Sequence, residues 1–250
     1  IDGRGMTALP PLINGHTHAA MTLLRGYADD MGLMEWLQTK IWPFEGRLTK
    51  DDVLVGSRLA CLEMIKSGAT FFNDMYWHWH ATAEAVEEMG LRALLSPVFI
   101  DGGDEARGET NRRMVEEIHG GLDGYSGRVR FALGPHAIYT VSADNLRFMK
   151  EFARAQNVPI HIHLSETADE VQTCLKSRKL RPVEYLDSIG FLGPEVFAAH
   201  CVHLAEKEID LLAANRVKAI HIPVSNLKLA VGGIMPMAAL TKAGVSVLLG

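Results

Sequence analysis

Short apolar segments rich in β-forming residues recur along the chain, and polar stretches with helical periodicity separate them. Most of the segments are apolar at nearly every position, which is typical of parallel strands buried on both faces. The pattern predicts eight strands, over Ala8–Asn14, Ala69–Asp74, Arg92–Ile100, Val129–Gly134, Val158–Leu164, Val196–Cys201, Lys218–Pro223 and Val245–Gly250.

Helical patterns lie between the predicted strands. The run Thr-Lys-Asp-Asp at 49–52 is typical of a capping box, and the helix that it opens is expected to end near Gly68. Ser142 is expected to cap a helix whose apolar positions recur at helical spacing. The other predicted helices cover about 82–89, 105–120, 168–175, 182–189, 206–214 and 236–243.

The regular alternation of strand and helix predicts an α/β fold, a (β/α)₈ TIM-like barrel over residues 8–250. An open doubly wound sheet is the alternative, but no Gly-x-Gly-x-x-Gly turn follows the first strand. The connection from Ala19 to Leu48 reads as one long loop, and a loop of that length in a barrel is usually a lid or a substrate wall.

Composition and charge exclude some classes of protein function. The 250 residues are 48% hydrophobic and 22% charged, which is ordinary for a globular protein. The net charge of -5 and the scattered basic residues argue against a nucleic-acid partner, and no apolar run is long enough to span a membrane. Three cysteines without metal-type spacing, and no secretory signal, favour a reducing cytoplasm. A small-molecule substrate is expected, and a homo-oligomer remains open.

Histidines gather at the ends of the predicted strands. His16 and His18 close the first strand, and residues two apart in an extended segment point to the same face, as metal ligands must. His161 and His163 repeat this spacing at the end of the fifth strand. Either pair taken alone could be polar loop residues, but in a barrel the carboxyl ends of all strands meet at one face. Their joint occurrence there predicts a metal site.

Two further residues add chemistry to this face. Glu166 lies three residues after His163, where a carboxylate can take and relay a proton from a water acidified by a metal. His200 ends the sixth strand, and His136 follows the fourth. The competing interpretations are a solvated loop glutamate and a hydrogen-bonded core histidine.

These residues resemble a known family. Asn14 to His18, Gly134-Pro-His136, His163-Leu-Ser-Glu166, Ala199 to His203 and Ser225 to Leu229 are similar to motifs of the amidohydrolase superfamily. The similarity is greatest to its branch of 5'-methylthioadenosine/S-adenosylhomocysteine deaminases and chlorotriazine hydrolases. It extends over nearly the whole chain and keeps the order of the motifs.

The resemblance implies one divalent metal ion, Zn²⁺ or alternatively Fe²⁺, held by His16, His18, His163 and an Asp expected just after Gly250. It implies Glu166 as the proton shuttle and His200 as the residue that orients the attacking water. Two-metal members use a Lys at the end of the fourth strand, and the sequence 131–136 has none. For the substrate, the resemblance implies contacts from His136, Glu45, Trp36 and Arg107, with Glu45 holding ribose hydroxyls.

Some positions depart from the family pattern. Pro97 stands where these deaminases can carry a second arginine, which favours a small 5'-substituent over a charged tail. Ile222 replaces an Asn, with no evident consequence. We expect residues 1–7 to be the remnant of a small β-sandwich domain, otherwise missing, and the barrel to lack its last helix.

The function implied is metal-dependent hydrolytic deamination of an adenosine-type nucleoside with release of ammonia. The substrates considered are 5'-methylthioadenosine, 5'-deoxyadenosine, adenosine and S-adenosylhomocysteine. One alternative is an amidohydrolase acting on a chlorotriazine, guanine or pterin ring; another is a metal-binding barrel without catalysis. Asp74, at the end of the second strand, could hydrogen-bond a ligand histidine, and His78 and His80 receive no role.

Overall fold

The computed structural model describes residues 2–28 and 30–250. Its strands follow the predicted order, and the strand pairs of the described residues are all parallel. One sheet has the order β1-β2-β3-β4 with β5 also beside β3, and the other has the order β6-β7-β8-β9. The strands are β1 Leu12–Thr17, β2 Ala69–Tyr76, β3 Arg92–Phe99, β4 Val129–Phe131, β5 Gly134–Pro135, β6 Ile160–Leu164, β7 Val196–His200, β8 Lys218–His221 and β9 Ser246–Leu249.

The two sheets join into one barrel. Isolated bridges link Leu133 to Ile160 and Ala137 to His163, so the segment carrying β4 and β5 lies beside β6. At the other seam β9 lies against β1: a β-carbon added at Gly15 would be 2.8 Å from the carbonyl oxygen of Leu249. Taking β4 and β5 as one interrupted strand, the barrel has the eight parallel strands expected from the sequence.

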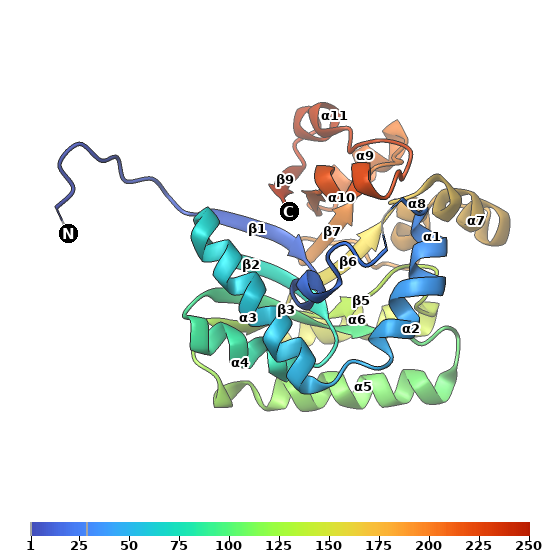
Figure 1. Cartoon of the computed structure of the whole chain (residues 1–250). Helices are drawn as coiled ribbons and strands as arrows, with labels where there is room; N and C mark the ends of the chain where they lie inside the picture. The colour runs from blue at the N-terminus through green and yellow to red at the C-terminus, as the bar shows by residue number, and fades with distance from the viewer. Residues whose placement is uncertain (1, 29) are drawn as a thin grey trace.

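Helices cover the outside of the strands, with α3, α4 and α5 along β1 to β3 (Figure 1). The capping box at Thr49 is present, and Gly68 ends α3 in the left-handed conformation with a φ of 85°. The α-helices are α1 Leu33–Trp36, α2 Trp42–Glu45, α3 Lys50–Ser67, α4 Trp79–Met89, α5 Glu105–Gly120, α6 Ala143–Gln156, α7 Ala168–Arg178, α8 Pro182–Ser188, α9 Glu206–Ala214, α10 Pro223–Lys228 and α11 Met237–Lys242.

The structure corrects several predicted boundaries. The first strand begins at Leu12, not Ala8, because Pro10 and Pro11 have no N–H to donate to a neighbouring strand. The seventh strand ends at His221, and Pro223 starts the unpredicted helix α10. Helix α4 begins at Trp79, three residues earlier than predicted. The fourth strand is split into Val129–Phe131 and Gly134–Pro135. Gly134 passes so close to the backbone of Pro97 that a side chain would overlap it.

The predicted long loop 19–48 is mostly helical. It contains the 3₁₀-helix η1 (Ala19–Leu24), α1, the π-helix η2 (Leu37–Ile41) and α2. Leu24, Leu37 and Ile41 form a small core of their own, packed against Trp36, Trp42 and other partly buried side chains. Local burial of apolar side chains therefore gives helical structure to a segment that the sequence predicts to be one long loop.

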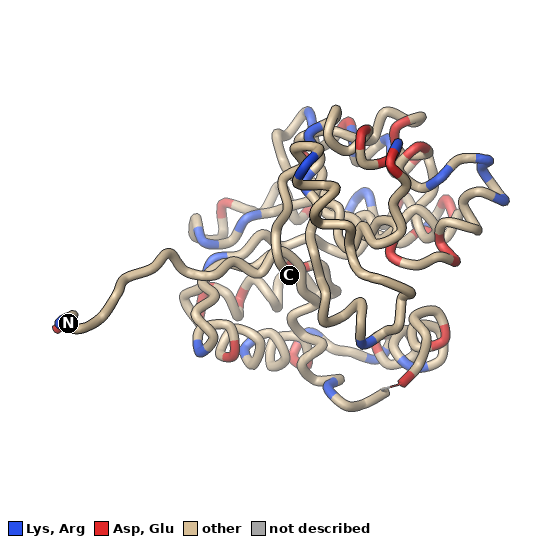
Figure 2. Tube along the Cα trace, turned by 90° about the horizontal axis from the view of Figure 1, so that it is seen from above, with Lys and Arg blue, Asp and Glu red and all other residues tan. Residues whose placement is uncertain are grey.

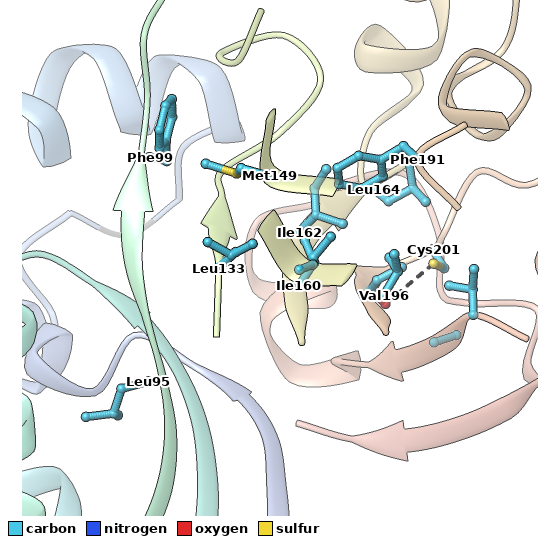
Figure 3. Packing of buried hydrophobic residues seen from close by; sticks show 14 of the residues in the cluster. Leu95, Phe99, Leu133, Met149, Ile160, Ile162, Leu164, Phe191, Val196 and Cys201 are labelled. Carbon is cyan, nitrogen blue, oxygen red and sulfur yellow. Dashed lines mark hydrogen bonds between the residues drawn. The ribbon is translucent and has the colours of Figure 1, made fainter. Parts of the chain in front are cut away.

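Strand β6 shows how the core positions the site. Ile160, Ile162 and Leu164 are fully buried and point into the layer between strands and helices, where Met149 and Phe191 pack nearby (Figure 3). Burial of each such side chain contributes about 1.5–3 kcal/mol. Because neighbouring residues of a strand alternate in direction, His161 and His163 face the barrel interior.

The N-terminal residues 2–11 form an exposed tail. Residues 2–11 contain no helix or strand and extend away from β1 (Figure 1). The assignment of residues 1–7 to a β-sandwich stays a prediction, and Ile1 lies outside the described residues.

On the surface, Lys and Arg are interspersed with Asp and Glu along the outer helices (Figure 2). Over the described ranges, no helix has the length and apolar character needed to cross a bilayer.

Candidate metal centre and active site

Three histidines converge at the carboxyl ends of β1 and β6. The ligand atoms of His16, His18 and His163 lie within 4.8 Å of one another. The Nε2 atoms of His18 and His163 are 3.4 Å apart. Two nitrogen ligands of a tetrahedral zinc ion, each bound at about 2.0–2.1 Å, lie about 3.4 Å from each other. The spacing therefore fits a metal ion between them.

The other ring nitrogen of each histidine is engaged elsewhere. Nδ1 of His18 donates to the carbonyl oxygen of Met75 at 2.6 Å, and Nδ1 of His163 donates to that of His136 at 2.8 Å. Nδ1 of His16 lies 2.8 Å from Nε2 of His161. Bonds of this kind fix the ring tautomer and orientation of metal ligands, leaving Nε2 to bind the metal. The donor set and its anchoring thus fit a resident divalent metal.

His161 belongs to the histidine pair that predicted the metal site, but the sequence assigned it no ligand role. It is fully buried and holds the ring of His16 in place. The alternation His161-Ile162-His163 places both histidines on one face of the strand, as expected.

Glu166 and His200 lie beside the three histidines. Oε1 of Glu166 is 3.5 Å from Nδ1 of His200, and that nitrogen also lies 2.8 Å from Oδ1 of Asn226. The acceptor is an amide oxygen, so Nδ1 of His200 carries the proton and donates to Asn226. Asn226, in the unpredicted helix α10, is thus a second residue that sequence reasoning did not assign to the site.

Burial changes the protonation of these groups. Removal from water raises the pKa of Glu166 to about 8 and lowers the pKa of His200 to about 4. The same cause, together with the neighbouring imidazoles, holds the pKa of His16 and His163 well below the ordinary range. Neutral imidazoles are the form that binds a metal, and a carboxyl group that binds a proton near neutral pH can exchange it.

Two turns with unusual backbone conformation carry Glu166 and His200. Ser165 has a φ of 51°, while His200 and Cys201 have φ values of 74° and 49°. Left-handed conformations are unfavourable for residues other than glycine and concentrate at functional sites. The turns are held by hydrogen bonds from the main-chain N–H groups of Val202 and His203 to the carbonyl oxygen of Ser165, at 3.0 and 2.9 Å.

A cavity of about 290 Å³ opens over these groups. A small cavity of about 50 Å³, here called the passage, lies between it and a larger outer cavity of about 620 Å³. The passage shares His18, Trp36 and His136 with the inner cavity, and Trp42, Glu45 and Trp77 with the outer one. The inner cavity is lined by His16, Thr17, His18, Met21, Leu33, Trp36, Leu37, His136, Tyr139, His163, Glu166, His200, Ile222, Ser225 and Leu229.

The four residues expected to bind substrate line this succession of cavities. Trp36 and His136 border the inner cavity, Glu45 borders the passage and the outer cavity, and Arg107 borders the outer cavity. Nδ1 of His136 is 3.0 Å from the hydroxyl of Thr140. Glu45 accepts a 3.0 Å hydrogen bond from the indole of Trp77, and burial raises its pKa.

Three other polar residues considered from the sequence, Asp74, His78 and His80, do not belong to the group of metal-binding histidines. The carboxylate of Asp74 accepts a 2.7 Å hydrogen bond from the N–H of Ala19 and so fixes the chain after His18, instead of bonding a ligand histidine. His78 lies 3.0 Å from the carbonyl oxygen of Leu48, in the wall of the outer cavity. His80 contacts the hydroxyl of Tyr125 at 2.7 Å.

Together, a parallel eight-stranded barrel and a histidine cluster at its carboxyl end define a barrel of the metal-dependent hydrolase class. The chain belongs to the amidohydrolase family, whose model matches residues 7–250. It is 50% identical over its whole length to a 5'-deoxyadenosine deaminase of Methanoregula boonei, and spans 57% of that protein. It is 49% identical to a 5-methylthioadenosine/S-adenosylhomocysteine deaminase of Pelotomaculum thermopropionicum, again spanning 57%.

A solved structure agrees with both the fold and the family. An adenosine deaminase of Xanthomonas campestris with bound zinc superposes with a TM-score of 0.89 at 38% identity. The match covers 96% of this chain and 55% of that one. The chain thus spans a little over half the length of the proteins that it matches.

Proposed function

We propose that the protein is a metal-dependent hydrolytic deaminase of adenosine-type nucleosides. The observation that carries this proposal is the buried carboxyl group of Glu166, which lines one cavity with three convergent histidines and with His200. Relatives at about half identity over the whole chain carry the names of nucleoside deaminases, which supports this class of substrate.

The metal expected here is one divalent ion held by His16, His18 and His163, with Zn²⁺ favoured over Fe²⁺ because a zinc-bound relative shares the fold at 38% identity. When bound, such an ion supplies a Lewis acid that makes water a stronger acid. We further propose an aspartate after Gly250 as fourth ligand. A β-carbon at Gly250 would be 2.8 Å from the main-chain nitrogen of His16, so this end of β9 lies beside the site.

The chain's own residues would move the protons. Glu166 would accept a proton from the attacking water and deliver it to a ring nitrogen of the purine, while the water oxygen bonds to the carbon that carries the amino group. A second proton transfer to the amino nitrogen allows the C–N bond to break, so that water and the aminopurine give the oxopurine and ammonia. General acid–base transfers of this kind contribute ~10²–10⁴-fold in rate.

His200 would orient the attacking water. Its imidazole is buried and neutral, and its Nδ1 proton is committed to Asn226, so Nε2 carries a free lone pair. That lone pair can accept a hydrogen bond from water. Removal of bulk water from the cavity strengthens each of these interactions.

The succession of cavities supports an extended nucleoside as substrate. The purine would occupy the inner cavity beside His136 and Trp36, and the ribose hydroxyls would reach the Glu45 carboxyl group at the passage. The 5'-substituent would then lie in the outer cavity, among Trp42, Trp77 and Arg107.

The lining of the outer cavity favours small, weakly polar 5'-groups. Its walls are mostly apolar, and Arg107 is the one Lys or Arg among the described residues that line it. Pro97, where a second arginine could stand, is part of strand β3. We therefore propose 5'-deoxyadenosine and 5'-methylthioadenosine as better substrates than S-adenosylhomocysteine, whose tail carries an ammonium and a carboxylate.

We also propose a reducing cytoplasm as the compartment and no macromolecular partner for the reaction. Cys61, Cys174 and Cys201 are all buried free thiols.

Ammonia release by the full-length protein tests the function. The panel contains 5'-deoxyadenosine, 5'-methylthioadenosine, adenosine, S-adenosylhomocysteine, guanine and a chlorotriazine, and the expected substrates are the first three. Glu45→Ala should raise KM for nucleosides, whereas Glu35→Ala, an exposed glutamate of the same segment, should not. Release from guanine alone, or chloride release from the triazine alone, would replace this proposal with another amidohydrolase activity.

A further inference from the structure

Glu170 has both carboxylate oxygens committed to the turn that carries Glu166. It lies in the first turn of α7, and only 6% of its surface is exposed. Oε1 accepts the N–H of Ser165 at 2.9 Å, and Oε2 accepts the N–H of Glu166 at 2.8 Å. A buried carboxyl group that accepts two main-chain hydrogen bonds holds that stretch of backbone firmly, because either N–H would otherwise be buried without a partner.

This arrangement differs from ordinary helix capping. Thr167 and Glu170 form the Thr-x-x-Glu pattern of a capping box, in which the glutamate would accept the N–H of the capping residue itself. Thr167 does cap α7, since its hydroxyl accepts the N–H of Glu170 at 3.1 Å. The carboxylate of Glu170, however, reaches past Thr167 to the two preceding residues.

The turn held by Glu170 needs such support. Ser165 is in the left-handed conformation, with a φ of 51°, which a non-glycine residue keeps only when its surroundings enforce it. From the other side, the carbonyl oxygen of Ser165 accepts the N–H groups of Val202 and His203, in the turn that follows His200. The turns carrying Glu166 and His200 are therefore bonded to each other, and Glu170 fixes the pair to α7.

We propose that Glu170 is a positioning residue for Glu166. It acts through the backbone: it sets where the Glu166 carboxyl group stands relative to His200 and the three histidines, and it does not itself line the inner cavity. This inference rests on the proposed function, in which Glu166 moves the protons. Loss of the anchor would leave the substrate cavity unchanged and misplace the proton-transferring group.

The test compares two buried carboxylates in the full-length protein. In Glu170→Gln one oxygen remains as an acceptor. The other is replaced by an amide NH₂, which cannot accept the main-chain N–H that it faces, so one of the two hydrogen bonds is lost. Glu208→Gln is the matched control, since Glu208 is fully buried and also accepts two main-chain N–H groups, from Val183 at 3.0 Å and Ala205 at 2.9 Å. Glu208 also pairs with Arg181, which donates to the carbonyl oxygen of His203 in the turn after His200. Glu208→Gln therefore removes a buried carboxylate near the same two turns but leaves the bonds to Ser165 and Glu166 in place.

For Glu170→Gln we expect kcat for 5'-deoxyadenosine to fall by at least about 10-fold, with KM and metal content within about 2-fold, since small misplacements of a reacting group can cost ~10²-fold. In Glu208→Gln kcat should stay within about 2-fold. Equal kcat in Glu170→Gln and wild type, or equal losses in the two variants, would overturn the proposal. If Glu170→Gln does not fold, Glu170→Asp, which keeps the charge but not the reach, should give the same loss.

A second measurement does not depend on activity. Hydrogen exchange of the amides of Ser165 and Glu166 should be faster in Glu170→Gln than in wild type, and unchanged in Glu208→Gln. Unchanged exchange at both amides would refute the anchoring. If the wild-type protein deaminates no nucleoside, the proposed function fails by itself, and the exchange data still decide whether Glu170 holds the turn.

Discussion

Nδ1 of His16 lies 2.8 Å from Nε2 of His161, although the two residues are 145 positions apart in the sequence. The contact joins strands β1 and β6 at the base of the histidine cluster. It leaves Nε2 of His16 as the nitrogen free for a metal. In metal sites, a partner of this kind orients the ligand and raises its basicity.

His161→Phe should therefore weaken metal binding. The substitution keeps the ring volume in a fully buried position but removes the nitrogen that holds His16. Loss of such a partner typically lowers metal affinity ~10–100-fold. Competition with a chelator measures this affinity. His119→Phe, on helix α5 and in contact with Phe131, is the control and should bind metal like wild type.

Removal of the metal should destabilise the folded protein. The cluster has buried imidazoles whose Nε2 atoms face one another, an arrangement that a bound cation relieves. A ligand present at a hundred times its Kd stabilises the native state by about 2.7 kcal/mol. We expect Tm to fall on treatment with a chelator and to recover on addition of zinc. An unchanged melting curve would contradict a metal bound at this cluster.

Gly15→Ala should destabilise the barrel where it closes. The added β-carbon would lie 2.8 Å from the carbonyl oxygen of Leu249 and 3.0 Å from Cγ2 of Ile220. Overpacking of this kind costs about 1–3 kcal/mol. Gly3→Ala is the matched control, because no atom lies within 4 Å of its added β-carbon. Urea unfolding of both variants measures the difference, and equal stabilities would show that β9 does not pack against β1 this closely.

Asp101 should stabilise the wall of the outer cavity in a pH-dependent way. Burial alone would raise its pKa, but hydrogen bonds from Gly103, Ser142 and Asn145 outweigh this and hold the pKa below the ordinary value. A carboxyl group whose pKa is lowered by folding contributes stability above its unfolded pKa of about 3.9 and loses it as pH falls towards the folded pKa.

Asp101→Asn should therefore lower the free energy of unfolding at pH 7, and the difference from wild type should narrow as pH is lowered from about 5 to about 3. Denaturant unfolding at several pH values checks this. Asp123→Asn, in the short 3₁₀-helix after α5 and outside this network, is the control. A difference that stays constant with pH would mean that the carboxylate charge of Asp101 is not what the hydrogen bonds stabilise.

The sequence predicts the barrel because most strands are compact apolar runs and several helices have a clear start or end signal. Thr49, Gly68 and Ser142 all act as expected. His16, His18 and His163 could be found because the carboxyl ends of parallel strands meet at one face, so residues distant in sequence are brought together by topology alone.

Other features depend on packing that no local pattern encodes. The segment 19–48 forms short helices in which Leu24, Leu37 and Ile41 bury one another. Asn226 reaches His200 only because Pro223 ends the strand early and begins α10. Glu170 matches a capping pattern, but in the folded chain its carboxyl group accepts hydrogen bonds from a different turn.

The central claim is that Glu166 transfers the protons of a nucleoside deamination. The most direct measurement is steady-state ammonia release from 5'-deoxyadenosine by full-length wild type and Glu166→Gln, with metal content determined on the same samples. We predict equal metal content and a kcat lower by ~10²–10⁴-fold in the variant. Near-normal turnover by Glu166→Gln with the metal in place would contradict the account.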